Sequence, residues 1–379
     1  MALAPGLDAS NAGLLRGNQA GNQTGREDMP RQLNPRGTGP SIADVAKEAG
    51  VATSTVSRAL TMPGRIAEPT RLKVEAAARK LGYTANQTAR NLRVGTSRTI
   101  MIVLPEEIYV GASQTVHEVL RAAAHSLKER GFSLLIANVS REEETDAHIL
   151  TVAQGGTVAG VLLMASYPPE QDGRSLTDTG LPIVAIHFDL SGQNIPSVVS
   201  NDYDAIVSAT TRLVAMGHRR FLYVRGRLGN YHEIERLRGV RDALAASGLP
   251  ETALRLSQGD FNFSGGMHAG EELLEIEPET RPTAVICAND DTAIGFIKTV
   301  IDGGLDVPGD VSVLGFDGAA VAPFMRPSLS TIEQDTAELG RRAADLVTDL
   351  VLEQHLPNAY RVEVPCRLVM RESTRAIEH

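Results

Sequence analysis

Small hydroxyl side chains and one arginine follow one another closely between residues 53 and 58 of this chain. Thr53, Ser54, Ser57 and Arg58 fall on one side of the stretch if it is helical. Hydroxyls both donate and accept hydrogen bonds, and a guanidinium can make two parallel bonds to guanine. Such a face could read the edges of DNA bases, although many helical hairpins also carry small polar residues outside.

The elements that must position this face are two short helices separated by Gly50. Ser41 can cap the first helix, where apolar residues recur at helical spacing. Gly50 is expected to end it, because glycine adopts the left-handed conformation at low cost. The inner face of the second helix is expected to consist of Val56, Ala59 and Leu60. These features predict a helix-turn-helix for the major groove.

A third helix is predicted directly after this pair. Pro69 suits its first turn, and Gly82 follows its expected end. Leu72, Ala76 and Leu81 are expected to form its buried face. The polar segment NQTARNLR comes soon afterwards.

The run from Ser41 to Arg93 closely resembles the DNA-binding headpiece and hinge of the lactose/galactose repressor family. The matching pieces are DVAKEAGVATSTVSRAL, RLKVEAAARKLGY and NQTARNLR. They are long and specific, and the resemblance extends to about residue 375. It implies a transcriptional regulator, foremost a repressor, that binds a near-palindromic operator duplex and responds to a small-molecule effector such as a sugar or sugar derivative. It implies no cofactor.

The resemblance also implies which headpiece residues contact DNA. Thr53, Ser54 and Arg58 match the positions that read base edges, while Thr55 and Ser57 suit phosphate contacts or helix support. Ala52 departs from the family's usual serine, which puts the first residue of this helix in doubt.

The segment after the headpiece matches the family's hinge, with Asn86, Ala89 and Leu92 as candidate DNA contacts. In the family this hinge becomes a short helix on the operator and wedges a leucine into the minor groove. Leu92 is the matching leucine, and Arg90 and Arg93 beside it could reach phosphates. The alternative is a packed linker helix that uses leucine to dock.

The charge distribution supports a nucleic-acid partner for one part of the chain only. The net charge is −9 over 379 residues, yet residues 41–98 hold ten Lys or Arg and four Asp or Glu. A basic head on an acidic body is typical of a DNA reader attached to another domain. The only cysteines, Cys287 and Cys366, lack metal spacing. No apolar run has the length of a membrane span or a signal peptide, so we expect a cytoplasmic protein.

From Thr99 onward, apolar strands alternate with amphipathic helices, which predicts an α/β fold with doubly wound parallel sheets. This part is about twice the usual size of one such unit, so two lobes of the periplasmic-binding-protein type are expected. The predicted organisation is a disordered tail (1–40), a helix-turn-helix headpiece (41–84), a hinge helix and linker (85–98), and a two-lobed effector-binding and dimerisation domain (99–379).

The resemblance assigns effector contacts to residues of the predicted lobes, among them Asn289 and Asp317 at the ends of predicted strands. Arg236 matches an arginine that holds the effector, Phe261 an aromatic beside it, and Asn289 and Asp317 further cleft positions. This set suits a polyhydroxylated ring. Arg236 and Asp317 are expected in different lobes, so that only a closed cleft satisfies both. Asp290, next to Asn289, suits a helix cap better than a ligand contact.

His187 stands where the family often has an acidic or aromatic specificity residue. It could equally be a buried histidine whose hydrogen bonds are satisfied inside the protein. The stretch Ile332–Asp335 is predicted to pass between the lobes. Because no leucine heptads follow Arg371, a homodimer is the economical expectation.

Other functional classes find less support in the residues. No Gly-x-Ser-x-Gly, P-loop, dinucleotide fingerprint or His-Glu-x-x-His motif occurs, and the nine histidines are dispersed. An enzyme is therefore not expected, and a sugar-metabolising enzyme would have to show turnover. A solute-binding protein of the same two-lobed fold remains the main alternative, but it would need an export signal and no basic headpiece.

Overall fold

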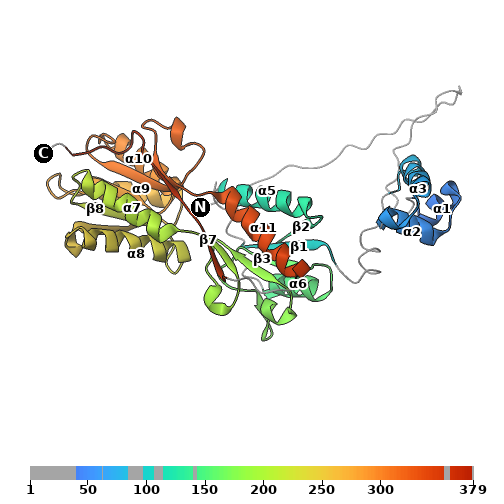
Figure 1. The fold of residues 1–379 in the computed structure, drawn as a ribbon. Helices are drawn as coiled ribbons and strands as arrows, with labels where there is room; N and C mark the ends of the chain where they lie inside the picture. Colours follow the sequence, from blue (N-terminus) through green and yellow to red (C-terminus); the bar gives the residue numbers. More distant parts are fainter. Residues whose placement is uncertain are drawn as a thin grey trace, which may run out of the picture. The chain divides into compact units, whose positions relative to one another are not determined.

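The computed structural model describes residues 40–61, 63–83, 97–105, 114–139, 143–353 and 359–377. They belong to two compact units, which divide between Gln87 and Thr88. Figure 1 shows the helices of the first unit and the strands and helices of the second. Most of the predicted tail and of the predicted hinge lies outside the described residues.

The first unit is a small bundle that contains the predicted helix-turn-helix. Its helices are α1 (Ile42–Ala49), α2 (Thr53–Thr61) and α3 (Glu68–Leu81), with a 3₁₀ turn η1 (Pro63–Arg65) after α2. Ser41 caps α1, and the Asp44 carboxylate accepts from the Ser41 N–H at 2.8 Å, which completes a capping box. Gly50 ends α1 with φ +67°, as predicted. The core consists of Val45, Ala46, Val56, Ala59, Val74, Ala77 and Ala78.

The buried face of α3 differs in part from the predicted one, because Leu81 packs against the core as predicted but Leu72 and Ala76 are exposed. Leu72 is 49% exposed, whereas Val74, Ala77 and Ala78 are buried. The sequence offers two overlapping apolar stripes here, and the buried one has the closer i, i+3, i+4 spacing of a straight helix. Both α1 and α2 contact α3, so the space between them admits valine and alanine and leaves the leucine outside.

The second unit is built on two six-stranded sheets. The first sheet has the order β13-β7-β6-β3-β1-β2, and all its pairs are parallel. The second has the order β14-β12-β11-β10-β8-β9, in which only β12 and β14 pair antiparallel. The predicted pair of doubly wound lobes is thus confirmed. A small hairpin, β4 (Glu170–Gln171) and β5 (Arg174–Ser175), forms a separate sheet.

The strands of the first sheet are β1 (Thr99–Pro105), β2 (Ser133–Val139), β3 (Gly160–Leu163), β6 (Ile183–Ile186), β7 (Ser197–Ser200) and β13 (Arg361–Val364). Those of the second sheet are β8 (Phe221–Arg225), β9 (Leu254–Gln258), β10 (Ala284–Cys287), β11 (Ser312–Asp317), β12 (Ser330–Glu333) and β14 (Arg367–Val369). Several short strands were not predicted, among them β7, β9 and β13. Each carries polar residues in a run of four or five, which blurs the pattern of a buried strand.

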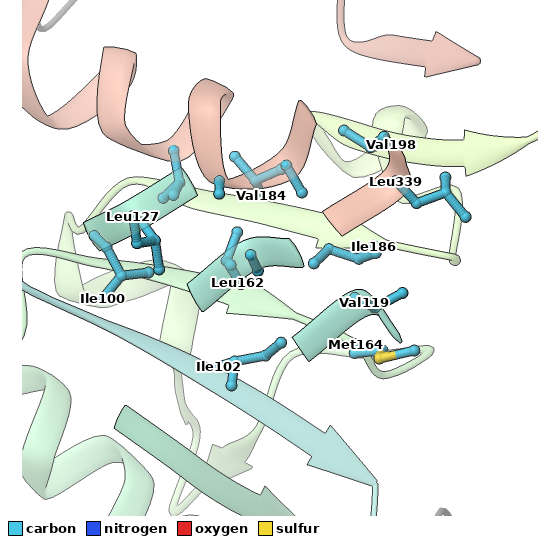
Figure 2. Close-up of a cluster of buried hydrophobic side chains, with 14 of the residues drawn as sticks. Ile100, Ile102, Val119, Leu127, Leu162, Met164, Val184, Ile186, Val198 and Leu339 are labelled. Carbon is cyan, nitrogen blue, oxygen red and sulfur yellow. The ribbon is translucent and has the colours of Figure 1, made fainter. Parts of the chain in front are cut away.

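Helices cover both faces of each sheet. They are α5 (Gln114–Glu129), α6 (Glu143–Gln154) and α11 (Thr336–Glu353) in the first lobe, and α7 (Asp202–Ala215), α8 (Tyr231–Ala246), α9 (Phe263–Leu274) and α10 (Asp290–Asp302) in the second. Short 3₁₀ turns are η3 (Leu176–Thr179), η4 (Ser191–Gln193), η5 (Glu251–Ala253) and η6 (Ala322–Phe324). Figure 2 shows the core under α5 and α11, where Val119 and Leu339 meet Leu162 and Ile186. Burial on both faces explains the continuous apolar run of β1.

The chain passes between the lobes at 200–202, at 333–336 and at 364–367, where it leaves one sheet and enters elements of the other lobe. The predicted crossover at Ile332–Asp335 is therefore confirmed. In the second lobe, α7 begins at Asp202 and α8 at Tyr231. The described helices include none that is long and apolar enough to span a membrane.

Glycines allow α9 and α10 to approach closely, and this contact can be tested. A Cβ on Gly266 would lie 2.0 Å from the carbonyl oxygen of Thr292. Alanine normally favours a helix, but here the backbones must separate, and overpacking of this kind costs about 1–3 kcal/mol. We expect Gly266→Ala to lower the urea midpoint of unfolding. Gly192→Ala is the control, because no atom lies within 4 Å of its Cβ position. Equal midpoints for both variants would contradict the proposed close packing.

Candidate functional site

The outer face of α2 carries the side chains predicted to read DNA. Thr53, Ser54 and Arg58 are exposed, and the Arg58 Nε donates to the Ser54 carbonyl at 3.3 Å. Thr55 and Ser57 are half-buried, in keeping with a supporting place at the edge of this face. Within the described part of the first unit, no other element covers Thr53, Ser54 and Arg58, so these side chains are accessible to a DNA groove.

The start of α2 is intact despite the departure at Ala52. The N–H groups of Thr55 and Val56 donate to the Ala52 carbonyl at 2.9 and 3.1 Å, so the first turn closes without a serine cap. The hinge candidates Asn86, Ala89 and Leu92 lie outside the described residues.

Four of the five predicted effector residues lie at the carboxyl ends of strands in the second unit. His187 follows β6, Phe261 comes shortly after β9, Asn289 follows β10, and Asp317 ends β11. Ligands of open α/β sheets bind at this end. His187, Phe261 and Asp317 have φ of +69°, +60° and +110°. Such strained backbone in non-glycine residues concentrates at functional sites, where the surroundings must hold it in place.

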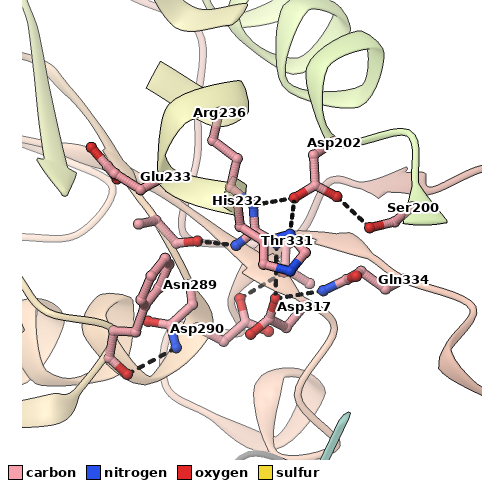
Figure 3. Close-up of polar contacts among 12 residues, drawn as sticks. Ser200, Asp202, His232, Glu233, Arg236, Asn289, Asp290, Asp317, Thr331 and Gln334 are labelled. Carbon is pink, nitrogen blue, oxygen red and sulfur yellow. Dashed lines mark hydrogen bonds and ion pairs between the residues drawn. The ribbon is translucent and has the colours of Figure 1, made fainter. Parts of the chain in front are cut away.

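Arg236 on α8 lies at the centre of a buried polar cluster (Figure 3). Its guanidinium is 3% exposed and donates from Nε to Asp202 at 2.8 Å and from Nη1 to the Ala288 carbonyl. It also stacks over the Phe316 ring, 3.6 Å from the centroid. Burial opposes ionisation of Asp202, but Arg236 and then His232 outweigh it and lower the pKa of the Asp202 carboxyl. The pair is therefore a stable ionic contact at neutral pH.

The expected placement of Arg236 and Asp317 in different lobes is wrong. Their Nη2 and Oδ1 atoms lie 3.5 Å apart, because α8 and β11 both belong to the second lobe. Only β10 separates β8, which precedes α8, from β11 in that sheet. Burial raises the pKa of Asp317, although Arg236 opposes the shift. No closure of the lobes is needed to bring these two groups together.

Two histidine rings are among the side chains that meet between the lobes. His187 follows β6 of the first sheet and His232 lies on α8, with ring centroids 5.6 Å apart in an edge-to-face arrangement. The His232 Nδ1 lies 2.9 Å from Asp202, and Phe188 is a further neighbour with its ring centroid 5.8 Å from that of His232. The buried Nε2 of His187 has no hydrogen-bond partner among the described residues. The alternative of a satisfied buried histidine therefore does not hold for this atom.

Asn289 and Phe261 lie next to one another. The Asn289 side chain caps α10 by accepting from Thr292 N–H at 3.0 Å, and its amide donates to the Phe261 carbonyl at 3.1 Å. The Phe261 ring packs on Gly226, where a Cβ would lie 2.0 Å from a ring carbon. The prediction that Asp290 caps this helix is wrong, because Asn289 supplies the capping oxygen. Asp290 instead accepts from the Thr331 hydroxyl and the Ala319 N–H, each at 2.6 Å.

Several residues of this cluster were missed from the sequence. Asp202 follows the unpredicted strand β7, so its place at a strand end was not visible. Gln334 was interpreted only as part of a crossover, yet its Nε2 donates to Asp317 at 2.7 Å and its buried Oε1 has no partner among the described residues. His232 directly precedes Glu233, and only the fold brings it to Asp202. In the described part of the chain, no group of three or more His, Cys, Asp or Glu could hold a metal ion.

Comparison with known proteins gives matches to both units. Residues 41–86 match the model of bacterial regulatory proteins of the lacI family, and residues 210–374 match a periplasmic binding protein-like domain. The HTH-type transcriptional repressor CytR of Escherichia coli K12 is 31% identical over 345 residues, covering 90% of this chain and 98% of that protein. Catabolite control protein A of Priestia megaterium is 28% identical, covering 88% and 99%.

Solved structures are similar over almost the same length. The lac repressor dimer bound to operator and the anti-inducer ONPF has a TM-score of 0.75 at 26% identity, covering 89% of this chain and 99% of that one. A complex of the transcriptional regulator CelR with cellobiose has a TM-score of 0.65 at 28% identity, covering 88% and 99%.

His187 provides a pH test of the cluster. Burial, and then the charge of His232, lower the pKa of His187 from 6.5 to about 3. Between these values the unfolded chain binds more protons, so the free energy of unfolding falls as the pH falls. Between pH 7.5 and pH 5.5, His187 should lower the free energy of unfolding by about 1.4 kcal/mol. We expect His187→Asn, which tolerates positive φ, to remove that part of the pH dependence in chemical denaturation. The exposed His268→Asn is the control, and an unchanged slope in His187→Asn would refute the assignment.

Proposed function

Because the chain belongs to the lacI family of bacterial regulatory proteins, we propose that it is a dimeric repressor of a near-palindromic operator. A sugar-like effector would either release the repressor from this DNA or hold it there. The protein is a DNA-binding transcriptional regulator controlled by a small molecule, and not an enzyme. The finer proposal rests on two features in one chain. Thr53, Ser54 and Arg58 are exposed on the headpiece, and the other unit has a buried polar cluster at strand ends.

The headpiece places α2 in the major groove of the operator. Arg58 bonds to guanine, Thr53 and Ser54 contact base edges, and Thr55 and Ser57 support the helix or reach phosphate. The lac repressor neighbour is a dimer bound to operator. A dimer of this chain would present two such helices, so its site would consist of two symmetric half-sites. Asn86, Ala89 and Leu92 extend the contact into the minor groove.

The effector lies at the cluster around Arg236. Asp317 has one oxygen that accepts from Gln334, and the other is available to a ligand hydroxyl. Phe261 offers an apolar ring face, and His187 brings an unpaired nitrogen from the other lobe. Hydroxylated rings have apolar faces and hydrogen-bonding edges, which matches this set. The CelR neighbour is bound to cellobiose, so an oligosaccharide or a related compound is a reasonable probe.

Effector binding would act through the segments that pass between the lobes. Asp202 begins α7 immediately after one of these segments, and Gln334 lies in another. A ligand that changes the contacts of these residues would favour one arrangement of the lobes, and operator affinity would follow. A regulator of this kind works in the cytoplasm, where its DNA is. The rival function of a solute-binding protein has no use for the basic helix-turn-helix.

Operator recognition can be tested by selection of random duplexes with the purified protein. We expect a twofold-symmetric site. The Arg58→Ala variant should lose about 1–3 kcal/mol of binding free energy and should lose sequence specificity at one base pair in each half-site. The control is Arg255→Ala, an exposed arginine on β9 of the other unit. Failure to recover a symmetric site would refute the proposal.

Effector binding can be tested at Asp317. A hydrogen bond to a charged group contributes about 1.5–3 kcal/mol, so Asp317→Asn should weaken binding of a responsive sugar by about ten- to a hundredfold in calorimetry. Cellobiose, glucose and ribose are the first probes. Operator binding without sugar should persist. Arg236→Ala is the poorer variant, because it would leave the buried Asp202 without its cation. Wild-type affinity in Asp317→Asn would place the site elsewhere.

A further inference from the structure

The arginines at the strand ends of the cluster are already engaged with carboxylates. Arg236 bonds to Asp202, and its other side faces Asp317. Arg225, which ends β8, donates to Glu233 at 2.8 Å. None of these contacts leaves a bare guanidinium to which an anionic ligand could bind. An anion would have to displace a carboxylate from a buried partner, which is costly.

Arg361 of β13, which approaches from the first lobe, is engaged as well. Its Nε lies 2.8 Å from Asp189, it pairs with Glu363, and it bonds to the Tyr231 hydroxyl at the start of α8. The cations contributed by three different elements are thus neutralised within the protein.

The helix N-termini at this edge are also occupied. Phosphate groups in α/β folds commonly bind the free N–H groups at the start of a helix. Here the side chains of Asn230, Asn262 and Asn289 accept from those N–H groups in α8, α9 and α10. Acidic residues follow in the first turn, with Glu233 in α8 and Asp290 and Asp291 in α10. These helix starts therefore have fewer free N–H groups for a dianion, and at α10 the carboxylates of Asp290 and Asp291 also oppose one.

Asp290 and Asp291 form no ion pair among the described residues. Burial, and then the charge of Asp317, raise the pKa of Asp290 to about 7 and that of Asp291 to about 6. Burial acts in this direction at both positions, and the nearby Asp317 carboxylate adds to the shift. At the cluster, the buried atoms without a hydrogen-bond partner among the described residues are the acceptor Gln334 Oε1 and His187 Nε2. Gln334 Oε1 and Asp317 both call for a hydrogen-bond donor, which a hydroxyl supplies and a phosphate dianion lacks.

We propose that the effector of this regulator is an uncharged hydroxylated compound, and that the cluster around Arg236 excludes its phosphorylated form. The inference rests on the proposed effector site and narrows its ligand class. A hydroxyl donates to Asp317 or Gln334, while the ring lies beside Phe261. A phosphate on the same ring would face arginines that are already ion-paired, helix starts that are already capped, and the carboxylates of Asp290 and Asp291, which have no ion pair among the described residues.

The test compares matched pairs on the full-length protein by calorimetry. The pairs are glucose and glucose 6-phosphate, ribose and ribose 5-phosphate, and cytidine and cytidine 5′-monophosphate. For any pair that binds, we expect the uncharged member to bind at least tenfold more tightly. A phosphorylated member that binds as tightly or more tightly would overturn the proposal.

A second arm needs no knowledge of the ligand. Inorganic phosphate is titrated against sodium chloride of equal ionic strength while the thermal midpoint is followed. We expect no saturable stabilisation of the wild type by phosphate. Saturable stabilisation that disappears in Arg236→Lys would place an anion at the cluster and overturn the proposal, whether or not any sugar binds.

A variant with a matched control isolates the role of charge. Asp291→Asn removes one negative charge at the cluster, and Glu279→Gln removes one from an exposed position elsewhere. We expect only Asp291→Asn to reduce the difference in affinity between the uncharged and the phosphorylated member of a pair, or to allow saturable stabilisation by inorganic phosphate. Equal effects of both variants would show that net charge alone, and not the cluster, sets the preference.

The two proposals fail in distinguishable ways. Operator binding that responds to a sugar phosphate would leave the regulator intact and refute only the charge preference. Loss of symmetric operator binding would refute the proposed repressor and leave the ligand measurements standing.

Discussion

The buried ion pair between Asp202 and Arg236 joins several elements of the second unit. Asp202 begins α7 directly after the chain has left the first sheet, and Arg236 lies on the neighbouring helix. The same guanidinium reaches the Ala288 carbonyl, the Phe316 ring and Asp317, so one side chain holds the ends of two strands. Breaking a buried pair by removing one partner typically costs about 3–5 kcal/mol.

The pair also connects the two lobes, since His232 shares the Asp202 carboxylate and faces His187 of the first lobe. Around it the backbone is strained at His187, Phe261 and Asp317, all with positive φ. Such strain persists only where the surroundings determine the conformation. The surrounding structure therefore holds these three residues in conformations that non-glycine residues rarely adopt.

Much of the fold was predictable because its signals are local. Ser41 and Gly50 bound α1 through short-range capping and backbone preferences, and the buried strands of both lobes are continuous apolar runs. The errors arose where two local patterns compete or a long-range contact decides. In α3 the stripe with Val74 was buried in place of the one with Leu72. In α10 the cap is Asn289 and not Asp290, because Thr331 and Ala319 bond to Asp290 from distant segments.

The sequence by itself determined the family, the helix-turn-helix and the two doubly wound lobes, since these follow from motifs and periodicity within short windows. Only the tertiary structure decided how the cluster is assembled. Arg236 and Asp317 lie together in one lobe because their elements belong to the same sheet, and Asp202, His232 and Gln334 join them from segments far apart in the chain. The sequence pattern also does not show which arginines have a carboxylate partner and which carboxylates lack a cation, because ion pairing depends on distances between residues that are far apart in the chain.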